Sequence, residues 1–267
     1  MRSDPMPALT GKRALVTGST QGIGLAVARR LAAGGCDIIL HGLGDPDASA
    51  ALQRDIETDS GCRTLYSSAD LRNPSAIERM MATALEAFGG IDILVNNAVT
   101  RHVAPIESMT PEQWNEDLAV NLSAAFHTIR LALPGMKTRN WGRIVNVSSI
   151  YGLVGAANRA GYVTTKTALI GLTRAVALET TGHDITCNAV CPGTSATPIH
   201  EASIATLRQG QALERDAAER VLLAGKQPTG RLIAPEGIAA LIVSLCGPES
   251  RDITGAAIPI DGGWSAM

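Results

Sequence analysis

Aromatic side chains are scarce in this 267-residue sequence, which contains three Trp, three Tyr and two Phe. A core must therefore be built from Ala, Val, Ile and Leu, which supply most of the 45% of hydrophobic residues. An aliphatic chain with 27 glycines suits buried parallel strands alternating with helices, because such strands are covered on both faces. The high apolar and low charged content excludes intrinsic disorder.

An excess of either charge is also missing, since 23 basic and 25 acidic side chains give a net charge of −2. This balance gives no electrostatic reason to bind nucleic acid or an anionic membrane. The longest apolar run, around 238–246, is far short of the roughly 20 residues of a bilayer span, and the N-terminus lacks a signal-peptide core. We therefore expect a cytoplasmic location.

Cysteine is infrequent as well, with five scattered residues. An odd number without a spacing pattern favours buried reduced thiols over a disulfide framework. No metal site is expected.

Strand-like and helix-like segments alternate from end to end. We expect strands at Ala14–Thr17, Asp37–Leu40, Thr64–Tyr66, Ile91–Val95, Arg143–Val147, Ile185–Val190 and Ala257–Ile260. Helices are expected at Ile23–Ala33, Ala48–Thr58, Pro74–Phe88, Pro111–Lys137, Tyr162–Thr180 and Pro235–Leu245. This order predicts one α/β domain over residues 1–267, a Rossmann-type doubly wound parallel sheet of seven strands flanked by helices. The polar segment Pro198–Arg231 breaks the alternation and is expected to be a helical lid over a ligand pocket.

A glycine-rich turn joins the first expected strand to the first helix, with the spacing G-x-x-x-G-x-G. Glycines allow a tight turn and close backbone approach, and the helix N-terminus offers unpaired N–H groups to a pyrophosphate. Glycines in such a turn can also be purely structural. The residues expected to touch the cofactor here are Gly18, Ser19, Thr20, Gln21, Gly22, Ile23 and Gly24.

The end of the second expected strand, His41 to Asp47, should lie beside the adenosine ribose. A 2′-phosphate there would need Arg or Lys, and this segment and Gln21 offer neither. Asp45 and Asp47 would repel a phosphate, although no carboxylate stands at the strand end itself to hold a 2′-hydroxyl. We therefore expect NAD in preference to NADP.

Tyr162 and Lys166 are four residues apart on an expected helix, so their side chains share one face. A free tyrosine has a pKa near 10, too high for a general base at neutral pH. An ammonium about 4 Å away favours a phenolate by on the order of 4 kcal/mol. Such a pair alone also fits a solvated helix face, but Ser149 closes an expected strand 13 residues earlier. Asn121 stands inside an expected helix, where asparagine is a poor helix former.

Together these motifs resemble the short-chain dehydrogenase/reductase family. The resemblance covers nearly the whole chain through Thr17-Gly18-x-x-x-Gly22-x-Gly24, Ala69-Asp70-Leu71, Asn96-Asn97-Ala98, Asn121, Ser149, Tyr162-x-x-x-Lys166, Pro192-Gly193, Thr197 and Asp261-Gly262-Gly263-Trp264. It implies an enzyme that interconverts a secondary alcohol and a ketone by hydride transfer with a nicotinamide cofactor. It also implies a homotetramer.

The resemblance assigns roles by position. Tyr162 is the implied acid/base, Ser149 bonds the reacting oxygen, Lys166 holds the nicotinamide ribose and favours the phenolate, and Asn121 anchors a proton-passing water. The implied cofactor contacts beyond the glycine-rich turn are Asp70, Leu71, Asn97, Tyr162, Lys166, Gly193 and Thr194. Val99 departs from the usual Gly, and would be strained if its backbone needed a positive φ.

Within the family, the chain looks most like the D-3-hydroxybutyrate dehydrogenases, judged by the stretches 37–45, 121–128 and 151–162, by Lys226-Gln-Pro228 and by Gly263-Trp264. Its substrate positions differ. Arg101 replaces Gln, Tyr151 replaces His, Arg159 replaces Lys, Thr194 replaces Trp and Ser203 replaces Gln. Each of the two guanidiniums can bind a carboxylate, which is consistent with an acidic substrate. The loss of Trp at position 194 should enlarge the pocket. The expected substrate contacts are Arg101, Ser149, Tyr151, Arg159 and Trp264, and the expected substrate is a hydroxy acid or polyol bulkier than 3-hydroxybutyrate.

Three alternatives remain open from the sequence. The chain can be an NADPH-dependent carbonyl reductase, which the missing basic residue near His41 disfavours. It can be a nucleotide-sensing protein without catalysis, which the complete set Asn121, Ser149, Tyr162 and Lys166 disfavours. The two arginines can serve the surface or a subunit contact instead of a substrate.

Overall fold

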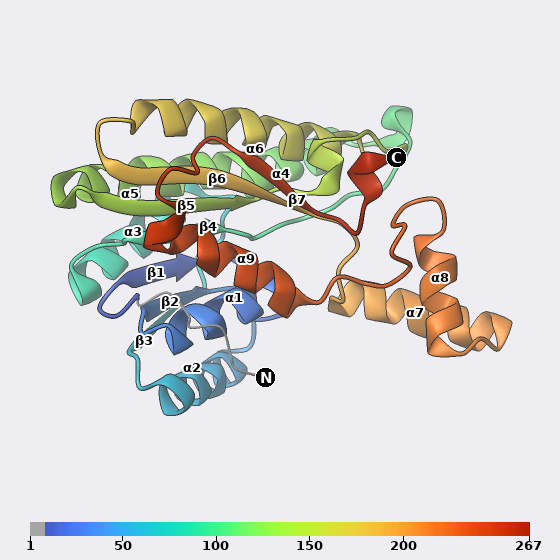
Figure 1. Cartoon of the computed structure of the whole chain (residues 1–267), viewed down its shortest axis with the longest axis horizontal. Coiled ribbons are helices and arrows are strands. Elements are labelled where there is room, and N and C mark those ends of the chain that lie inside the picture. The colour runs from blue at the N-terminus through green and yellow to red at the C-terminus, as the bar shows by residue number, and fades with distance from the viewer. Residues whose placement is uncertain (1–8) are drawn as a thin grey trace.

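The computed structural model describes residues 9–267, and their strands form one parallel sheet in the order β3-β2-β1-β4-β5-β6-β7 (Figure 1). The strands are β1 (Arg13–Val16), β2 (Asp37–His41), β3 (Thr64–Ser67), β4 (Ile93–Asn96), β5 (Trp141–Val147), β6 (Asp184–Pro192) and β7 (Ala257–Ile260). The order reverses between β1 and β4, the point of a doubly wound sheet at which ligands bind. The predicted seven-stranded parallel sheet is confirmed.

Helices cover both faces of this sheet (Figure 1). One layer contains α1 (Gly22–Ala33), α2 (Pro46–Ser60) and α9 (Pro235–Cys246), and the other contains α3 (Pro74–Phe88), α5 (Ala124–Arg139) and α6 (Ala160–Glu179). Successive strand side chains point to opposite faces, so Ala14 and Val16 of β1 pack with the first layer while Leu15 packs with the second. This double burial explains why the strands consist of aliphatic residues.

The prediction of one continuous helix at Pro111–Lys137 is wrong, although the segment is helical. The structure divides it into α4 (Pro111–Leu118), a π-helical turn η2 (Ala119–Ser123) and α5. In the turn, the N–H of Ala124 donates to the carbonyl of Ala119 five residues earlier. Asn121 lies inside this turn and is buried. Single π turns within α-helices occur frequently at functional sites.

The segment expected to form a lid is helical, with α7 (Pro198–Gln211) and α8 (Arg215–Leu223). Figure 1 shows both helices, in orange, projecting from the sheet on the side of the C-terminal turn. The chain then returns to the sheet edge, where Ser195 and Ile233 form an isolated bridge.

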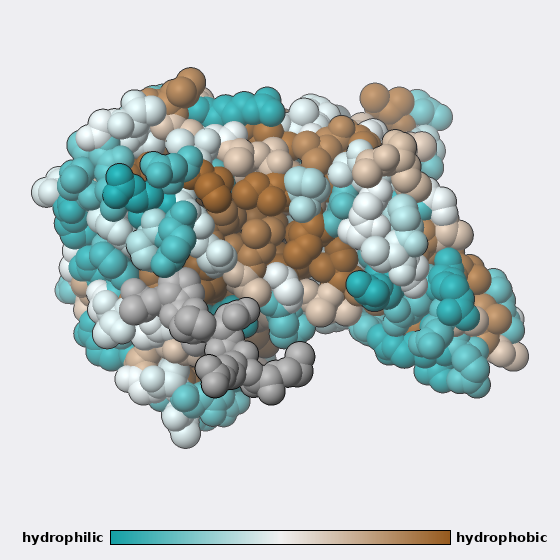
Figure 2. All heavy atoms as spheres, in the orientation of Figure 1, coloured by the Kyte–Doolittle hydropathy of each residue, from teal (hydrophilic) through white to brown (hydrophobic). Residues whose placement is uncertain are grey.

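An apolar surface lies over α9 and β7 (Figure 2). Leu241, Ile258 and Ile260 are half-buried there, and β7 is an edge strand. A partner subunit would suit such a surface, and the homotetramer stays a prediction. Across residues 9–267, every helix is too short or too polar to cross a bilayer.

Candidate active site

The glycine-rich turn between β1 and α1 is shaped by close backbone contacts. Gly18 has φ +63, and a Cβ on Gly24 would lie 2.1 Å from the carbonyl oxygen of Gly18 and 2.5 Å from Asn97 Nδ2. Only glycine fits at position 24. Gln21 caps α1 without a side-chain hydrogen bond, and the first turn has no acidic residue. The helix N–H groups and positive dipole end therefore remain available to a phosphate.

Asn97 fixes the conformation of this turn through hydrogen bonds. Its Nδ2 donates to the carbonyls of Thr17 and Gly18 at 2.9 and 3.0 Å, and its N–H donates to Thr17 Oγ1 at 2.9 Å. The side-chain amide is therefore committed to the turn. Asn97 also lines the cavities described below.

His41 holds the turn from the side, a role that the sequence reasoning missed. Its Nδ1 accepts the N–H of Gly18 at 3.0 Å, so Nε2 carries the proton and donates to the carbonyl of Ala69 at 2.9 Å. Its N–H donates to Ser19 Oγ at 2.9 Å. Burial lowers the pKa of the His41 imidazole, which keeps it neutral. The only signal in the sequence is a histidine at the end of the neighbouring strand.

A cavity of about 480 Å³ extends from this turn across the C-terminal edge of the sheet. Most of the predicted cofactor residues of this half line it: Gly18, Thr20, Gln21, Gly22, Ile23, Asp70, Leu71 and Asn97. Ser19 and Gly24 do not, because Ser19 is fully buried against His41 and Gly24 lies against Gly18. The size, the glycine cradle and the free helix terminus fit a dinucleotide.

Arg72 also lines this cavity. It lies outside the segment from His41 to Asp47 in which a basic residue was expected for a 2′-phosphate. Its guanidinium donates to Asp70 at 2.8 Å and to Glu116 Oε1 at 3.3 Å. The Arg72 guanidinium lowers the pKa of the Asp70 carboxyl. Two carboxylates therefore already engage Arg72, and Arg101, the other arginine that lines this cavity, also lines the second cavity described next.

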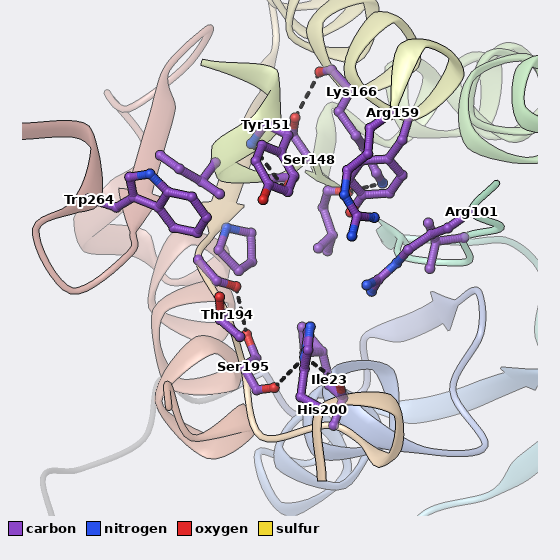
Figure 3. A pocket seen from close by; sticks show the side chains of 18 of the residues that line it. Ile23, Arg101, Ser148, Tyr151, Arg159, Lys166, Thr194, Ser195, His200 and Trp264 are labelled. Atoms are coloured by element: carbon purple, nitrogen blue, oxygen red, sulfur yellow. Dashed lines mark hydrogen bonds between the residues drawn. The ribbon is translucent and has the colours of Figure 1, made fainter. Parts of the chain in front are cut away.

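A second cavity of about 220 Å³ continues from the first and shares Ile23, Asn97 and Val99 with it. Figure 3 shows side chains converging on it from several elements. All five predicted substrate residues line it together with three of the four predicted catalytic residues and two predicted nicotinamide contacts: Arg101, Ser149, Tyr151, Arg159, Trp264, Tyr162, Lys166, Gly193 and Thr194. The structure thus brings together residues that are up to 163 positions apart in the chain.

Lys166 and Tyr162 lie side by side at the start of α6, where both are buried. Lys166 Nζ donates to the carbonyl of Val147 at 2.8 Å and stands 5.7 Å from the centre of the Tyr162 ring. Burial, with a smaller contribution from the charge of Arg101, lowers the pKa of Lys166 to about 7. The amine can therefore gain or lose a proton near neutral pH.

Ser149 follows the end of β5 and is also buried. Its Oγ accepts the N–H of Tyr151 at 3.2 Å, which leaves its hydroxyl proton available to a ligand oxygen.

Asn121 is not part of the open cavities, but its side chain fixes one wall of them. Its Oδ1 accepts the N–H of Thr100 at 2.9 Å, and its Nδ2 donates to the Thr100 carbonyl at 3.0 Å and to Thr165 Oγ1 at 3.3 Å. A small enclosed cavity of about 10 Å³ is lined by Asn121 and Lys166. This volume and these polar groups suit about one water molecule.

The walls of the second cavity differ in chemistry. Tyr151 and Trp264 form an aromatic wall, with ring centres 5.4 Å apart and planes at 78°. The guanidinium of Arg101 stands 5.4 Å from the Tyr162 ring centre, and that of Arg159 stands 5.7 Å from the Tyr151 ring centre. In Figure 3 the two arginines lie across the cavity from Trp264. An acidic group can thus be bound beside an apolar surface.

The strain considered for Val99 is absent. Among residues 9–267 the positive-φ residues other than glycine are Asn140, Asn158 and Ala212. Val99 instead adopts an ordinary backbone and presents a 41% exposed side chain to both cavities.

Side chains of the segment 198–231 complete the second cavity: His200, Ser203, Leu222 and Lys226. His200 and Lys226 were not expected at the site from the sequence. Neighbouring Gln227 is buried and fixes the chain after β6, because its Oε1 accepts the N–H of Thr194 at 2.9 Å. Nothing in local spacing indicates these contacts, since they depend on how α7 and α8 return to the sheet.

Comparison with known proteins gives matches over nearly the whole chain. The family described as short chain dehydrogenase matches residues 12–208. The D-beta-hydroxybutyrate dehydrogenase of Cupriavidus necator is 46% identical over 97% of this chain and 100% of its own length. The enzyme of the same name from Rhizobium meliloti is 43% identical over 96% of this chain and 99% of its own length.

A solved structure agrees with these matches. L-sorbose reductase from Gluconobacter frateurii, complexed with NADPH and L-sorbose, has a TM-score of 0.91 at 29% identity and covers 96% of this chain and 97% of its own. Sequence, fold and the assembled residues lead to one conclusion: the chain belongs to the short-chain dehydrogenase family of nicotinamide-dependent oxidoreductases and interconverts an alcohol and a ketone.

Proposed function

We propose that this enzyme is an NAD-dependent dehydrogenase of a hydroxy acid, which it interconverts with the corresponding keto acid. The observation that carries the proposal is the pair of guanidiniums, Arg101 and Arg159, in the cavity that also contains Tyr162 and Lys166. A guanidinium binds a carboxylate through two parallel hydrogen bonds, which fixes a planar acid group in one orientation. Two relatives named for a hydroxy acid, D-beta-hydroxybutyrate, support this substrate class.

Tyr162 is the group that exchanges a proton with the substrate. Its deprotonated form, the phenolate, takes the proton of the substrate alcohol and becomes the neutral phenol, and Ser149 donates a hydrogen bond to the same substrate oxygen. The nicotinamide, when bound, supplies the acceptor for the hydride of the carbinol carbon. Lys166 stabilises the deprotonated tyrosine by its charge.

The proton then leaves through buried groups. Lys166 has a pKa of about 7, so it can relay a proton without a large energetic penalty. The small cavity between Lys166 and Asn121 is sized for one water, which would connect the amine to the π-helical turn. Asn121 serves this path by holding the turn against Thr100.

The cofactor is held by this chain at three places. The backbone of the glycine-rich turn and the N-terminus of α1 would bind the pyrophosphate, Asp70 and Leu71 would contact the adenine, and Gly193 and Thr194 would contact the nicotinamide half. His41, which lines the cofactor cavity, is neutral and buried, and no arginine or lysine follows it in the described segment up to Asp47. This arrangement favours a free 2′-hydroxyl over a 2′-phosphate.

An NADPH-dependent carbonyl reductase is the second candidate. Arg72 lines the cofactor cavity and could bind a 2′-phosphate if it released Asp70, and the solved L-sorbose reductase is complexed with NADPH. The bidentate contact with Asp70 and the additional contact with Glu116 make NAD the favoured cofactor.

A panel of hydroxy acids, polyols and cyclic alcohols, assayed with NAD⁺ and with NADP⁺ at alkaline pH, tests the proposal. We expect turnover of hydroxy acids, with a higher kcat/KM for NAD⁺ than for NADP⁺. Turnover of polyols or cyclic alcohols alone would contradict the substrate class, and a higher kcat/KM with NADP⁺ would contradict the cofactor.

A further inference from the structure

The substrate cavity carries more positive charge than one carboxylate would neutralise. Arg101, Arg159 and Lys226 all line it, in addition to Lys166 at its base. No Asp or Glu of residues 9–267 is among the lining residues. Arg101, Arg159 and Lys226 also form no ion pair with the part of the chain that the structure describes, although many other arginines do: Arg13, Arg29, Arg63, Arg72, Arg130, Arg139, Arg143, Arg215 and Arg251.

These three cations reach the cavity from different parts of the fold. Arg101 belongs to the loop after β4, Arg159 precedes α6, and Lys226 follows α8. Figure 3 shows the two arginines on one side, above His200. Lys226 comes from the segment between α8 and β7, so the cations that line the cavity belong to three separate segments of the chain.

His200 indicates that the three charges converge. Its Nδ1 lies 2.8 Å from the Ser195 carbonyl oxygen and 3.1 Å from Thr197 Oγ1, so the ring is fixed at the cavity wall. Burial first, and then the charges of Arg101, Arg159 and Lys226, lower the pKa of this imidazole. The histidine therefore stays neutral, and the excess positive charge is that of Arg101, Arg159 and Lys226.

Arg101 and Arg159 are half-buried, whereas Lys226 is exposed. Like charges gathered around one cavity repel one another, and the repulsion is relieved when an anion is bound. One carboxylate saturates the two guanidiniums at most. We propose that the substrate carries two anionic groups, one bound by Arg101 and Arg159 and the other by Lys226, as in a hydroxy dicarboxylic acid. The aromatic wall of Tyr151 and Trp264 then contacts the carbon chain between the two groups. This inference rests on the proposed dehydrogenase function and deepens it.

Binding of unreactive acids tests the charge count without turnover. Glutarate and pentanoate both contain five carbons and differ in the second carboxylate. Titration of the NADH-loaded enzyme in a calorimeter should give a Kd for glutarate at least about tenfold lower than that for pentanoate, the size of one charge-assisted contact. Equal dissociation constants would overturn the inference.

Lys226→Met identifies the second anion site, and Lys137→Met on α5 is the matched control that removes one lysine outside the cavity. We expect the glutarate preference to fall to within about twofold of unity in Lys226→Met and to stay as in the unmodified enzyme in Lys137→Met. A glutarate preference that survives in Lys226→Met would contradict the assignment of this lysine and overturn the proposal.

Turnover separates the inference from the function on which it rests. With NAD⁺, we expect 3-hydroxyglutarate to give a higher kcat/KM than 3-hydroxypentanoate. Faster turnover of the monocarboxylic acid would overturn the inference and leave the hydroxy acid dehydrogenase standing. Turnover of neutral polyols in place of both acids would overturn the two together. A hydroxy acid that carries a terminal phosphate, tested beside these, shows whether the second anion is a carboxylate or a phosphate, and preference for either dianion supports the proposal.

Discussion

Replacing Lys166 with methionine should make the cofactor-free protein more stable at pH 6 while removing its activity. The amine is buried, and its pKa is lowered from 10.5 to about 7. Folding therefore disfavours the charged amine that the unfolded chain carries. Between pH 7 and 10.5 the unfolded state binds more protons than the folded state, so the contribution of this group to stability rises with pH through that window. Methionine has no such dependence.

The magnitude follows from the pKa shift and from one hydrogen bond. A shift of about 3.5 units means that the buried charged amine destabilises the folded state by about 5 kcal/mol below pH 7. Methionine carries no charge, so the substitution removes this penalty. Methionine also leaves the Val147 carbonyl without the N–H donor at 2.8 Å, at a cost of about 2 kcal/mol. We therefore expect Lys166→Met to be more stable by about 3 kcal/mol at pH 6, and the difference to vanish near pH 9.

Urea unfolding of both cofactor-free proteins, followed by circular dichroism at one protein concentration, measures this difference at pH 6, 7.5 and 9. Burial raises the pKa of three thiols to about 12, those of Cys36, Cys187 and Cys246, so the stability of both proteins falls above about pH 9. Both proteins contain these thiols, so their effect cancels when the two free energies of unfolding are subtracted. A variant that is no more stable than the unmodified enzyme at pH 6, or a difference independent of pH, would refute the reasoning.

Three further predictions concern the turn, the helix beside Tyr162 and the substrate cavity. Gly161→Ala would place a Cβ 2.3 Å from Asp117 Oδ2, so we expect a loss of about 2 kcal/mol in urea unfolding, and an unchanged midpoint would contradict it. His41→Phe removes the acceptor for the Gly18 N–H and should raise the Kd of NADH at least about fivefold in a fluorescence titration, an effect that equal affinity would exclude. Arg159→Ala should raise KM for hydroxy acids about tenfold or more. An unchanged KM for every accepted substrate would show that Arg159 does not bind the substrate carboxylate.

The residues that the structure groups at the cavities as expected from the sequence are those whose placement depends on local spacing or on strand ends. Tyr162 and Lys166 share a helix face because they are four residues apart, and the glycine-rich turn needs only the order of strand, glycines and helix. The strand ends place Ser149 and Gly193 at the same sheet edge, since parallel strands end on one side. The fold and the grouping of the cavity residues could therefore be predicted.

The remaining features depend on contacts between distant segments. The π-helical turn at Asn121 reflects hydrogen bonds to Thr100, 21 residues earlier in the chain. The role of His41 depends on a ring that reaches back to Gly18, 23 residues away. Lys226 enters the cavity only through the path of α7 and α8. No periodicity or motif encodes such contacts, so the π-helical turn and the roles of His41 and Lys226 could not be predicted from the sequence.

The central claim, proton transfer by Tyr162 in a nicotinamide-dependent enzyme, is tested most directly by Tyr162→Phe, which removes one hydroxyl and keeps the buried ring. NAD⁺-dependent turnover of the best hydroxy acid and NADH fluorescence titration should be measured on the same preparation. We predict a fall in kcat of at least about a thousandfold, with the Kd of NADH within about twofold of the unmodified enzyme. Turnover that persists in Tyr162→Phe while NADH still binds would contradict the account.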